Sequence, residues 1–100
     1  MLVAHQKPDG DTLGSSISIL NYLVSHGKSV TAFCSTPVPD QYAYLPQVQC
    51  FTSDPAVFKT QHDLLCVFDS GDLRYAGVAK FLETMPKRPF IVNLDHHATN

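Results

Sequence analysis

The sequence lacks any apolar run near the roughly 20 residues that a membrane-spanning helix needs, and its first residues lack the basic-then-apolar pattern of a secretory signal. Positive charge is also scarce, because 7 Lys and Arg stand against 9 Asp and Glu and no stretch concentrates the basic residues. A surface for double-stranded nucleic acid is therefore not expected. We predict a cytoplasmic protein that does not contact a membrane.

The cysteines are few and form no recognisable pattern. Cys34, Cys50 and Cys66 are odd in number and widely spaced, with no C-x-x-C pair. This argues against a disulfide framework and against a cysteine zinc site. We expect three reduced thiols that pack as small core residues.

Short apolar runs alternate with stretches of helical spacing, and 100 residues suffice for one modest core. The expected strands are residues 1–4, 29–34, 64–68 and 90–94. One helix is expected from Leu13 to a C-terminal cap at Gly27, and a second over 73–84. This alternation predicts an α/β fold with a doubly wound, mainly parallel sheet and helices on both faces.

The loop before the first helix is rich in turn-forming residues. Pro8 is expected to hold Lys7 in an extended conformation, and Gly10 to supply a positive φ. Either Asp11 or Thr12 is expected to be the N-cap of the helix. The N-terminus of that helix then faces the loop with partial positive charge, which suits a phosphate group.

Acidic residues and histidines gather in stretches 5–11, 69–72 and 95–97, each of which follows a predicted strand. Each stretch alone is also typical of a turn, a helix cap or a surface histidine pair. Carboxyl ends of parallel strands meet at one edge of a sheet, where α/β proteins bind ligands, so the coincidence favours a metal site. Five candidate ligands of imidazole and carboxylate type favour two manganese or magnesium ions over one zinc ion. Two such ions can hold a hydroxide for attack on a phosphate ester.

The order H-x-x-P-D-G-D-x-x-G-S, then D-S-G-D, then D-H-H resembles the DHH phosphoesterase superfamily over the whole chain. Within it, the sequence is most similar to bacterial bifunctional oligoribonuclease/pAp phosphatases (nanoRNases). The resemblance implies that His5 and Asp9 hold one manganese ion, that Asp11 and His96 hold the other, and that Asp69 bridges them. Magnesium is the alternative metal.

The same resemblance assigns roles to residues that hold no metal. His97 is expected to touch the scissile phosphate, and Asp95 to orient a histidine without contacting the metal. Asp69 is expected to be catalytic together with His97 and Asp95, because a ligand that bridges two ions positions both of them. Asp72 is expected to be a helix cap.

Proteins of this family carry a further metal-ligating aspartate and a DHH-associated substrate-binding domain beyond the three motifs. Residues 1–100 are therefore expected to be the N-terminal part of the catalytic domain, without that second domain. On their own they are expected to be inactive, to bind at most one manganese tightly and to aggregate. The sequence leaves open whether the full-length protein forms a homodimer.

The expected function is manganese-dependent hydrolysis of short single-stranded oligoribonucleotides, of 3'-phosphoadenosine 5'-phosphate (pAp), or of both. Other enzymes with these motifs are alternatives: a cyclic-dinucleotide phosphodiesterase, a manganese inorganic pyrophosphatase or a single-strand exonuclease. A receiver domain would use Asp9, Asp11 and Asp69 around one magnesium, but it needs a lysine after a late strand, and none is visible. A non-catalytic nucleotide-binding domain is disfavoured because every motif residue is intact.

Overall fold

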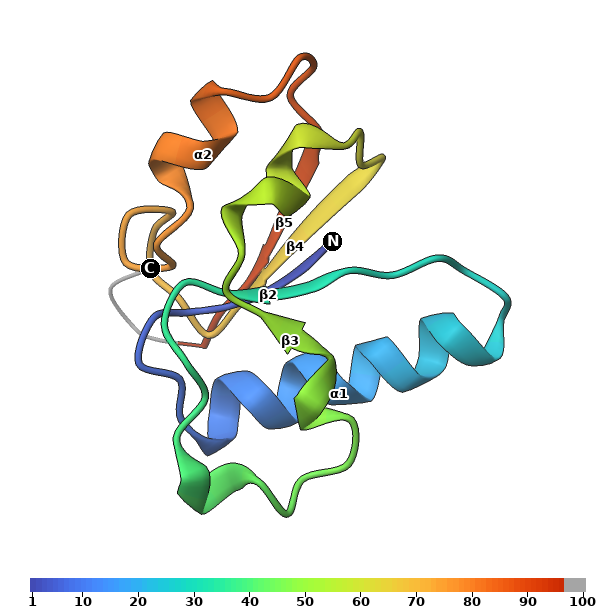
Figure 1. Ribbon diagram of the computed structural model, residues 1–100, viewed down its shortest axis with the longest axis vertical. Helices are drawn as coiled ribbons and strands as arrows, with labels where there is room; N and C mark the ends of the chain where they lie inside the picture. The colour runs from blue at the N-terminus through green and yellow to red at the C-terminus, as the bar shows by residue number, and fades with distance from the viewer. Residues whose placement is uncertain (97–100) are drawn as a thin grey trace.

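The computed structural model describes residues 1–96, which form one five-stranded sheet in the order β3-β2-β1-β4-β5, with every neighbouring pair parallel (Figure 1). The strands are β1 (Leu2–Ala4), β2 (Ala32–Cys34), β3 (Phe51–Thr52), β4 (Leu64–Phe68) and β5 (Phe90–Leu94). The helices are α1 (Gly10–Ser25) and α2 (Ala79–Glu83), and single 3-10 turns are η1 (Asp40–Tyr42), η2 (Val48–Cys50) and η3 (Pro55–Lys59).

The chain enters the sheet at its centre and winds in two directions. From β1 it crosses through α1 to β2 on one side, and later returns to place β4 on the other side of β1. The strand order therefore reverses between β1 and β4. At such a switch point the connections leave in opposite directions, so a crevice opens outside the carboxyl ends of the two strands.

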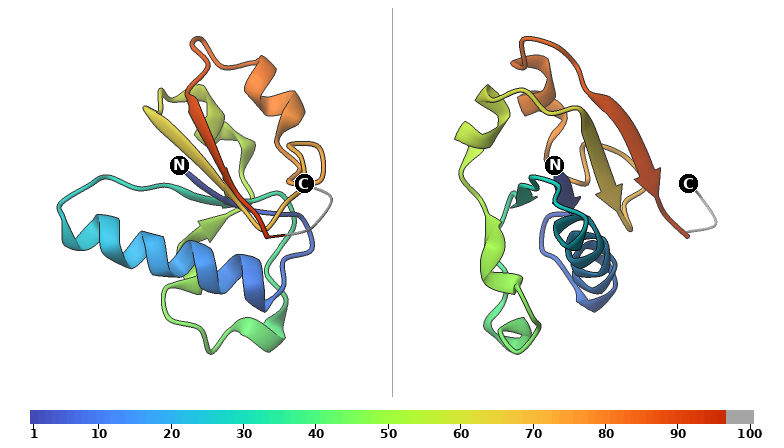
Figure 2. Two further views of the ribbon diagram at one scale, coloured as in Figure 1. Left: turned by 180° about the vertical axis from the view of Figure 1, so that it is seen from behind. Right: turned by 90° about the vertical axis from the view of Figure 1, so that its right-hand side faces the viewer.

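Side chains alternate between two cores, as the pleat of a strand requires. Leu2 of β1 packs under α1, whereas Val3 joins the core beneath η3 and α2 on the opposite face. Figure 2 shows α1 on one side of the sheet and α2 on the other. The prediction of a parallel α/β sheet with helices on both faces is confirmed.

The start of α1 differs from the prediction. Asp9 is the N-cap, and its Oδ1 accepts the Thr12 backbone N–H at 3.1 Å, so the helix begins at Gly10. Asp11 and Thr12, predicted as caps, lie inside the first turn. The positive φ falls on Lys7 (51°) and not on Gly10. A contact with a distant part of the chain accompanies this conformation, since the N–H of Lys7 donates to Thr36 Oγ1 at 2.7 Å.

The end of α1 is where the sequence placed it. Gly27 has φ of 75° and donates its N–H to the carbonyl of Val24, while the N–H of Lys28 reaches the carbonyl of Leu23, both at 3.0 Å. This pair of bonds is a Schellman motif, which uses glycine because a side chain is disfavoured at positive φ.

The second predicted helix is mostly absent, since only Ala79–Glu83 is helical and the preceding residues form turns. Gly77 has φ of 81°, which ends any helix, and a Cβ there would lie 2.2 Å from Ser35 Oγ. The close approach to Ser35 therefore overrides the helical spacing. Val78 and Leu82 are buried, whereas Tyr75 is half-exposed.

Two further predictions need correction. Strand β2 is only three residues long, shorter than the predicted 29–34. Cys34 and Cys66 are buried, and burial raises the pKa of both thiols, but Cys50 is exposed and does not belong to the core. Among residues 1–96, no helix is both long and apolar enough to cross a bilayer.

Candidate metal centre

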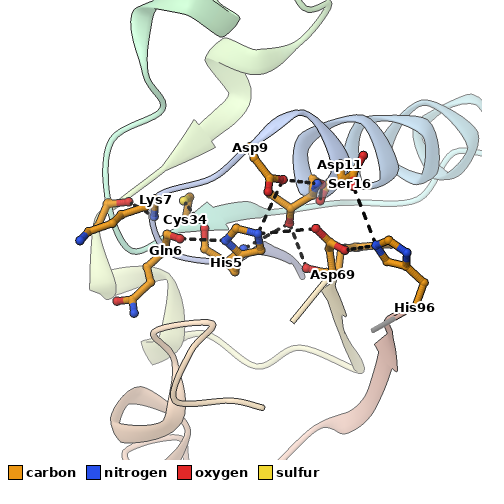
Figure 3. A network of polar contacts seen from close by, with 12 residues as sticks. His5, Gln6, Lys7, Asp9, Asp11, Ser16, Cys34, Asp69 and His96 are labelled. Carbon is orange, nitrogen blue, oxygen red and sulfur yellow. Dashed lines mark hydrogen bonds and ion pairs between the residues drawn. The ribbon is translucent and has the colours of Figure 1, made fainter. Parts of the chain in front are cut away.

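Three loops at the carboxyl edge of the sheet bring histidines and aspartates together (Figure 3). His5 follows β1, Asp69 follows β4 and His96 lies just beyond β5. Asp9 and Asp11 come from the N-terminus of α1. Each of these elements is placed by the packing of the sheet, so residues far apart in sequence meet at the switch point between β1 and β4.

The first ligand group consists of His5, Asp9 and Asp69. His5 Nε2 lies 3.7 Å from Asp9 Oδ1 and 3.7 Å from Asp69 Oδ2. His5 Nδ1 lies 2.8 Å from the Gln6 carbonyl, which can only accept, so Nδ1 donates to it and Nε2 is the nitrogen that faces the carboxylates. This is the arrangement a metal ligand needs, with the second nitrogen held by a backbone carbonyl.

The second ligand group consists of Asp11, Asp69 and His96. His96 Nε2 lies 2.8 Å from Asp69 Oδ1 and 3.8 Å from Asp11 Oδ2. The side chains of Asp11 and His96 are 74% and 71% exposed. Because His96 touches Asp69 directly, a cation between them would require the imidazole to move outward, which its exposure permits.

Asp69 belongs to both ligand groups. Its two oxygens face different histidines, Oδ2 toward His5 and Oδ1 toward His96. Its φ is 59°, in the left-handed region that aspartate tolerates better than most residues. Its N–H donates to the carbonyl of Leu94 at 2.8 Å, which fixes the turn against β5. The carboxylate thus stands between the two groups with 7% of its side chain exposed.

The donor set fits divalent cations that prefer oxygen and imidazole ligands. The 3.7 Å separations in the first group are too long for hydrogen bonds but suit atoms that share an ion, since ligands about 2.1 Å from one ion lie roughly 3 Å or more apart. Three carboxylates, from Asp9, Asp11 and Asp69, repel one another unless positive charge lies between them. The N-terminus of α1 supplies only part of that charge.

A cleft of about 710 Å³ opens beside the second group. Its lining is Asp11, Ser15, Ser18, Ile19, Phe68, Asp69, Leu94, Asp95 and His96. No lysine or arginine is among these residues. Its charged groups are the carboxylates of Asp11, Asp69 and Asp95, so an anionic substrate bound here would require bound cations.

The remaining predicted residues are placed as follows. Asp95 lines the cleft, and its predicted role stays a prediction. His97 lies outside the described residues. Asp72 belongs to neither ligand group; its Oδ1 accepts the Tyr75 N–H at 2.6 Å, so it caps a turn and not a helix. The sequence analysis gave no role to the ring of Tyr75, which lies 5.0 Å from that of His5.

Comparison with known proteins gives two findings. Residues 1–100 match the sequence model described as "DHH family, N-terminal domain". The "Bifunctional oligoribonuclease and PAP phosphatase NrnA" of Thermus thermophilus is 32% identical over 100 residues, which are 99% of this chain and 28% of that protein. The chain thus spans less than a third of the length of this curated relative.

Proposed function

The chain belongs to the DHH family, and from that premise we propose that the protein it forms part of is a metal-dependent phosphoesterase acting on short oligoribonucleotides, on pAp, or on both. A receiver domain, the alternative from another class, is incompatible with that membership. The observation that carries the proposal is the position of Asp69, whose two oxygens face two separate ligand groups.

The proposed centre holds two divalent ions, manganese or magnesium. His5 and Asp9 would hold one, Asp11 and His96 the other, and Asp69 would be shared by both. The chemistry such ions supply when bound is activation of water and neutralisation of charge on the phosphoryl oxygens. The identity of the metal rests on the donor set, since imidazole and carboxylate ligands suit manganese and carboxylates suit magnesium.

The residues of this chain would bind and orient the phosphate ester. The cleft beside Asp11 has a volume in the range of small-molecule sites and an apolar wall of Ile19, Phe68 and Leu94, which suits a nucleoside better than a free phosphate. We further propose that His97 contacts the scissile phosphate and that Asp95 orients a histidine. The substrate class follows the name of the Thermus thermophilus relative.

The test uses the full-length protein, stripped of metal and then supplied with manganese or magnesium. We expect hydrolysis of a triribonucleotide or of pAp only after metal is restored, and loss of turnover in Asp69→Asn. Asp72→Asn is the matched control, because Asp72 follows the same strand and an amide oxygen can still accept the Tyr75 N–H. Full activity without metal would contradict the proposal, as would equal losses in the two variants. Turnover of pyrophosphate or a cyclic dinucleotide alone would correct the substrate within the family.

A further inference from the structure

Thr12 connects three segments that carry ligands, although it is not itself a ligand. The side chain is fully buried. Its Oγ1 accepts the backbone N–H of His5 at 3.3 Å and donates to the carbonyl of Phe68 at 2.9 Å. Its own backbone N–H donates to Asp9 Oδ1 at 3.1 Å. The residue therefore contacts His5, Asp9 and the neighbour of Asp69 at once.

The hydroxyl lies where β1 and β4 stop pairing. Ala4 is aligned with Phe68 in the parallel register, and the next residue of each strand, His5 and Asp69, turns toward the ligand groups. The N–H of His5 and the carbonyl of Phe68 are buried backbone groups that need partners after the ladder ends. A hydroxyl can accept one bond and donate another at the same time, and Thr12 does both.

We propose that Thr12 is a positioning residue of the metal centre. Its hydroxyl sets the separation of the two strand ends, and hence the 3.7 Å spacing between His5 Nε2 and Asp69 Oδ2. Its backbone N–H holds the Asp9 carboxylate beside the same imidazole. The inference rests on the proposed function in one respect, namely that these side chains bind a divalent ion.

Three substitutions separate the hydroxyl from other properties of the site. Thr12→Val keeps the shape and removes both hydroxyl bonds, whereas Thr12→Ser keeps the hydroxyl. Ser16→Ala is the matched control: Ser16 is equally buried one turn later on α1, but its hydroxyl donates only to the carbonyl of Thr12 within the helix. If the loss of any buried hydroxyl were responsible, Thr12→Val and Ser16→Ala should change exchange and manganese affinity alike. If the loss of positioning is responsible, only Thr12→Val should change them.

Two readouts are measured on the full-length protein: amide hydrogen exchange at His5 without metal, and the dissociation constant for manganese. In Thr12→Val, the backbone amide hydrogen of His5 should exchange at least about tenfold faster than in wild type. The variant should also bind manganese about 10- to 100-fold more weakly, which is the range for residues that support metal ligands. Thr12→Ser and Ser16→Ala should stay near wild type in both. If Thr12→Val does not fold, Thr12→Ala removes the same hydroxyl without placing a methyl group against the Phe68 carbonyl.

Unchanged exchange at His5 in Thr12→Val, or unchanged manganese affinity, would overturn the positioning role. Effects of the same size in Ser16→Ala would also overturn the positioning role, because the change would then be a general effect of substitutions in α1. Failure of the proposed function has a different signature: wild type that binds manganese but hydrolyses no phosphate ester. In that case the exchange rates and affinities still decide the role of Thr12.

Discussion

The two ligand groups share Asp69 but differ in how firmly the fold holds their other members. The His5 side chain is 4% exposed, its Nδ1 is bonded to the Gln6 carbonyl, and Asp9 is held as the N-cap of α1. Asp9 is 56% exposed, but Asp11 and His96 are more exposed still, at 74% and 71%. A site whose ligands are already ordered loses less conformational entropy on binding. The first group should therefore bind its ion more tightly than the second.

The difference follows from the positions of the two groups in the sheet. The first lies at the switch point between β1 and β4, with strands on both sides. The second includes His96, which follows β5, the outer strand of the sheet formed by residues 1–96. Within these residues, the central strands are paired on both sides, whereas β5 is paired only with β4.

The largest effect is expected where the two groups meet. Asp69→Asn preserves the shape and tolerance of the left-handed φ, but an amide cannot supply two anionic oxygens. We expect turnover to fall by more than about a hundredfold, beyond the loss typical of residues that only support ligands. Metal analysis of the purified variant should show both sites weakened. Retention of one site at wild-type affinity would mean that Asp69 is not shared.

The next effect separates the groups. His5→Ala should weaken the tighter manganese site by more than about a hundredfold, beyond the loss typical of residues that only support ligands, and His96→Ala should weaken only the looser one, and by less. The physical reason is that the ordered imidazole contributes more binding free energy than the exposed one. Calorimetric titration of both full-length variants provides the comparison, and a larger loss in His96→Ala would reverse our ranking of the sites.

A third experiment compares the adjacent histidines. His96→Ala should lose manganese from the looser site, whereas His97→Ala should retain manganese in both sites and lose turnover, because His97 is proposed to contact the substrate. Metal content and turnover rate are measured on the same preparations. If both variants lose manganese equally, the division of roles is wrong.

The smallest effect separates the two roles of Asp9. Without metal, Asp9→Ala should lower the free energy of unfolding by about 1 kcal/mol through loss of the N-cap, whereas Asp9→Ser should retain most of the stability. Both should weaken manganese binding, because serine restores the cap and not the carboxylate. Denaturant unfolding in EDTA checks the first statement. Normal manganese affinity in Asp9→Ser would leave Asp9 as a cap alone.

Structural features that depend on neighbouring residues in the sequence could be predicted, whereas features that depend on contacts between distant residues could not. Strands β4 and β5 were predicted to the residue. The continuous apolar run of β4 marks a strand buried in the sheet, whereas β5 includes Asn93 and is only partly buried. The second helix was overpredicted because the constraint on Gly77 comes from Ser35, more than 40 residues away. Helical spacing contains no information about that contact.

The candidate site shows the same division. Motif order predicted which residues would gather, since each follows a strand and strand ends meet at one edge. The left-handed φ of 59° at Asp69, and its place between His5 and His96, were indicated by no residue pattern. The bonds of Thr12 were equally inaccessible, because they join strand ends that become neighbours only in the folded sheet.

The most direct test of two unequal sites sharing Asp69 is a manganese titration of the metal-free full-length protein followed by electron paramagnetic resonance. We predict a signal from isolated manganese up to one equivalent and a spin-coupled signal as the second site fills. Asp69→Asn should show no coupled signal at any ratio. Two equivalents bound with independent, uncoupled signals in the wild type, or coupling that survives in Asp69→Asn, would contradict the shared carboxylate.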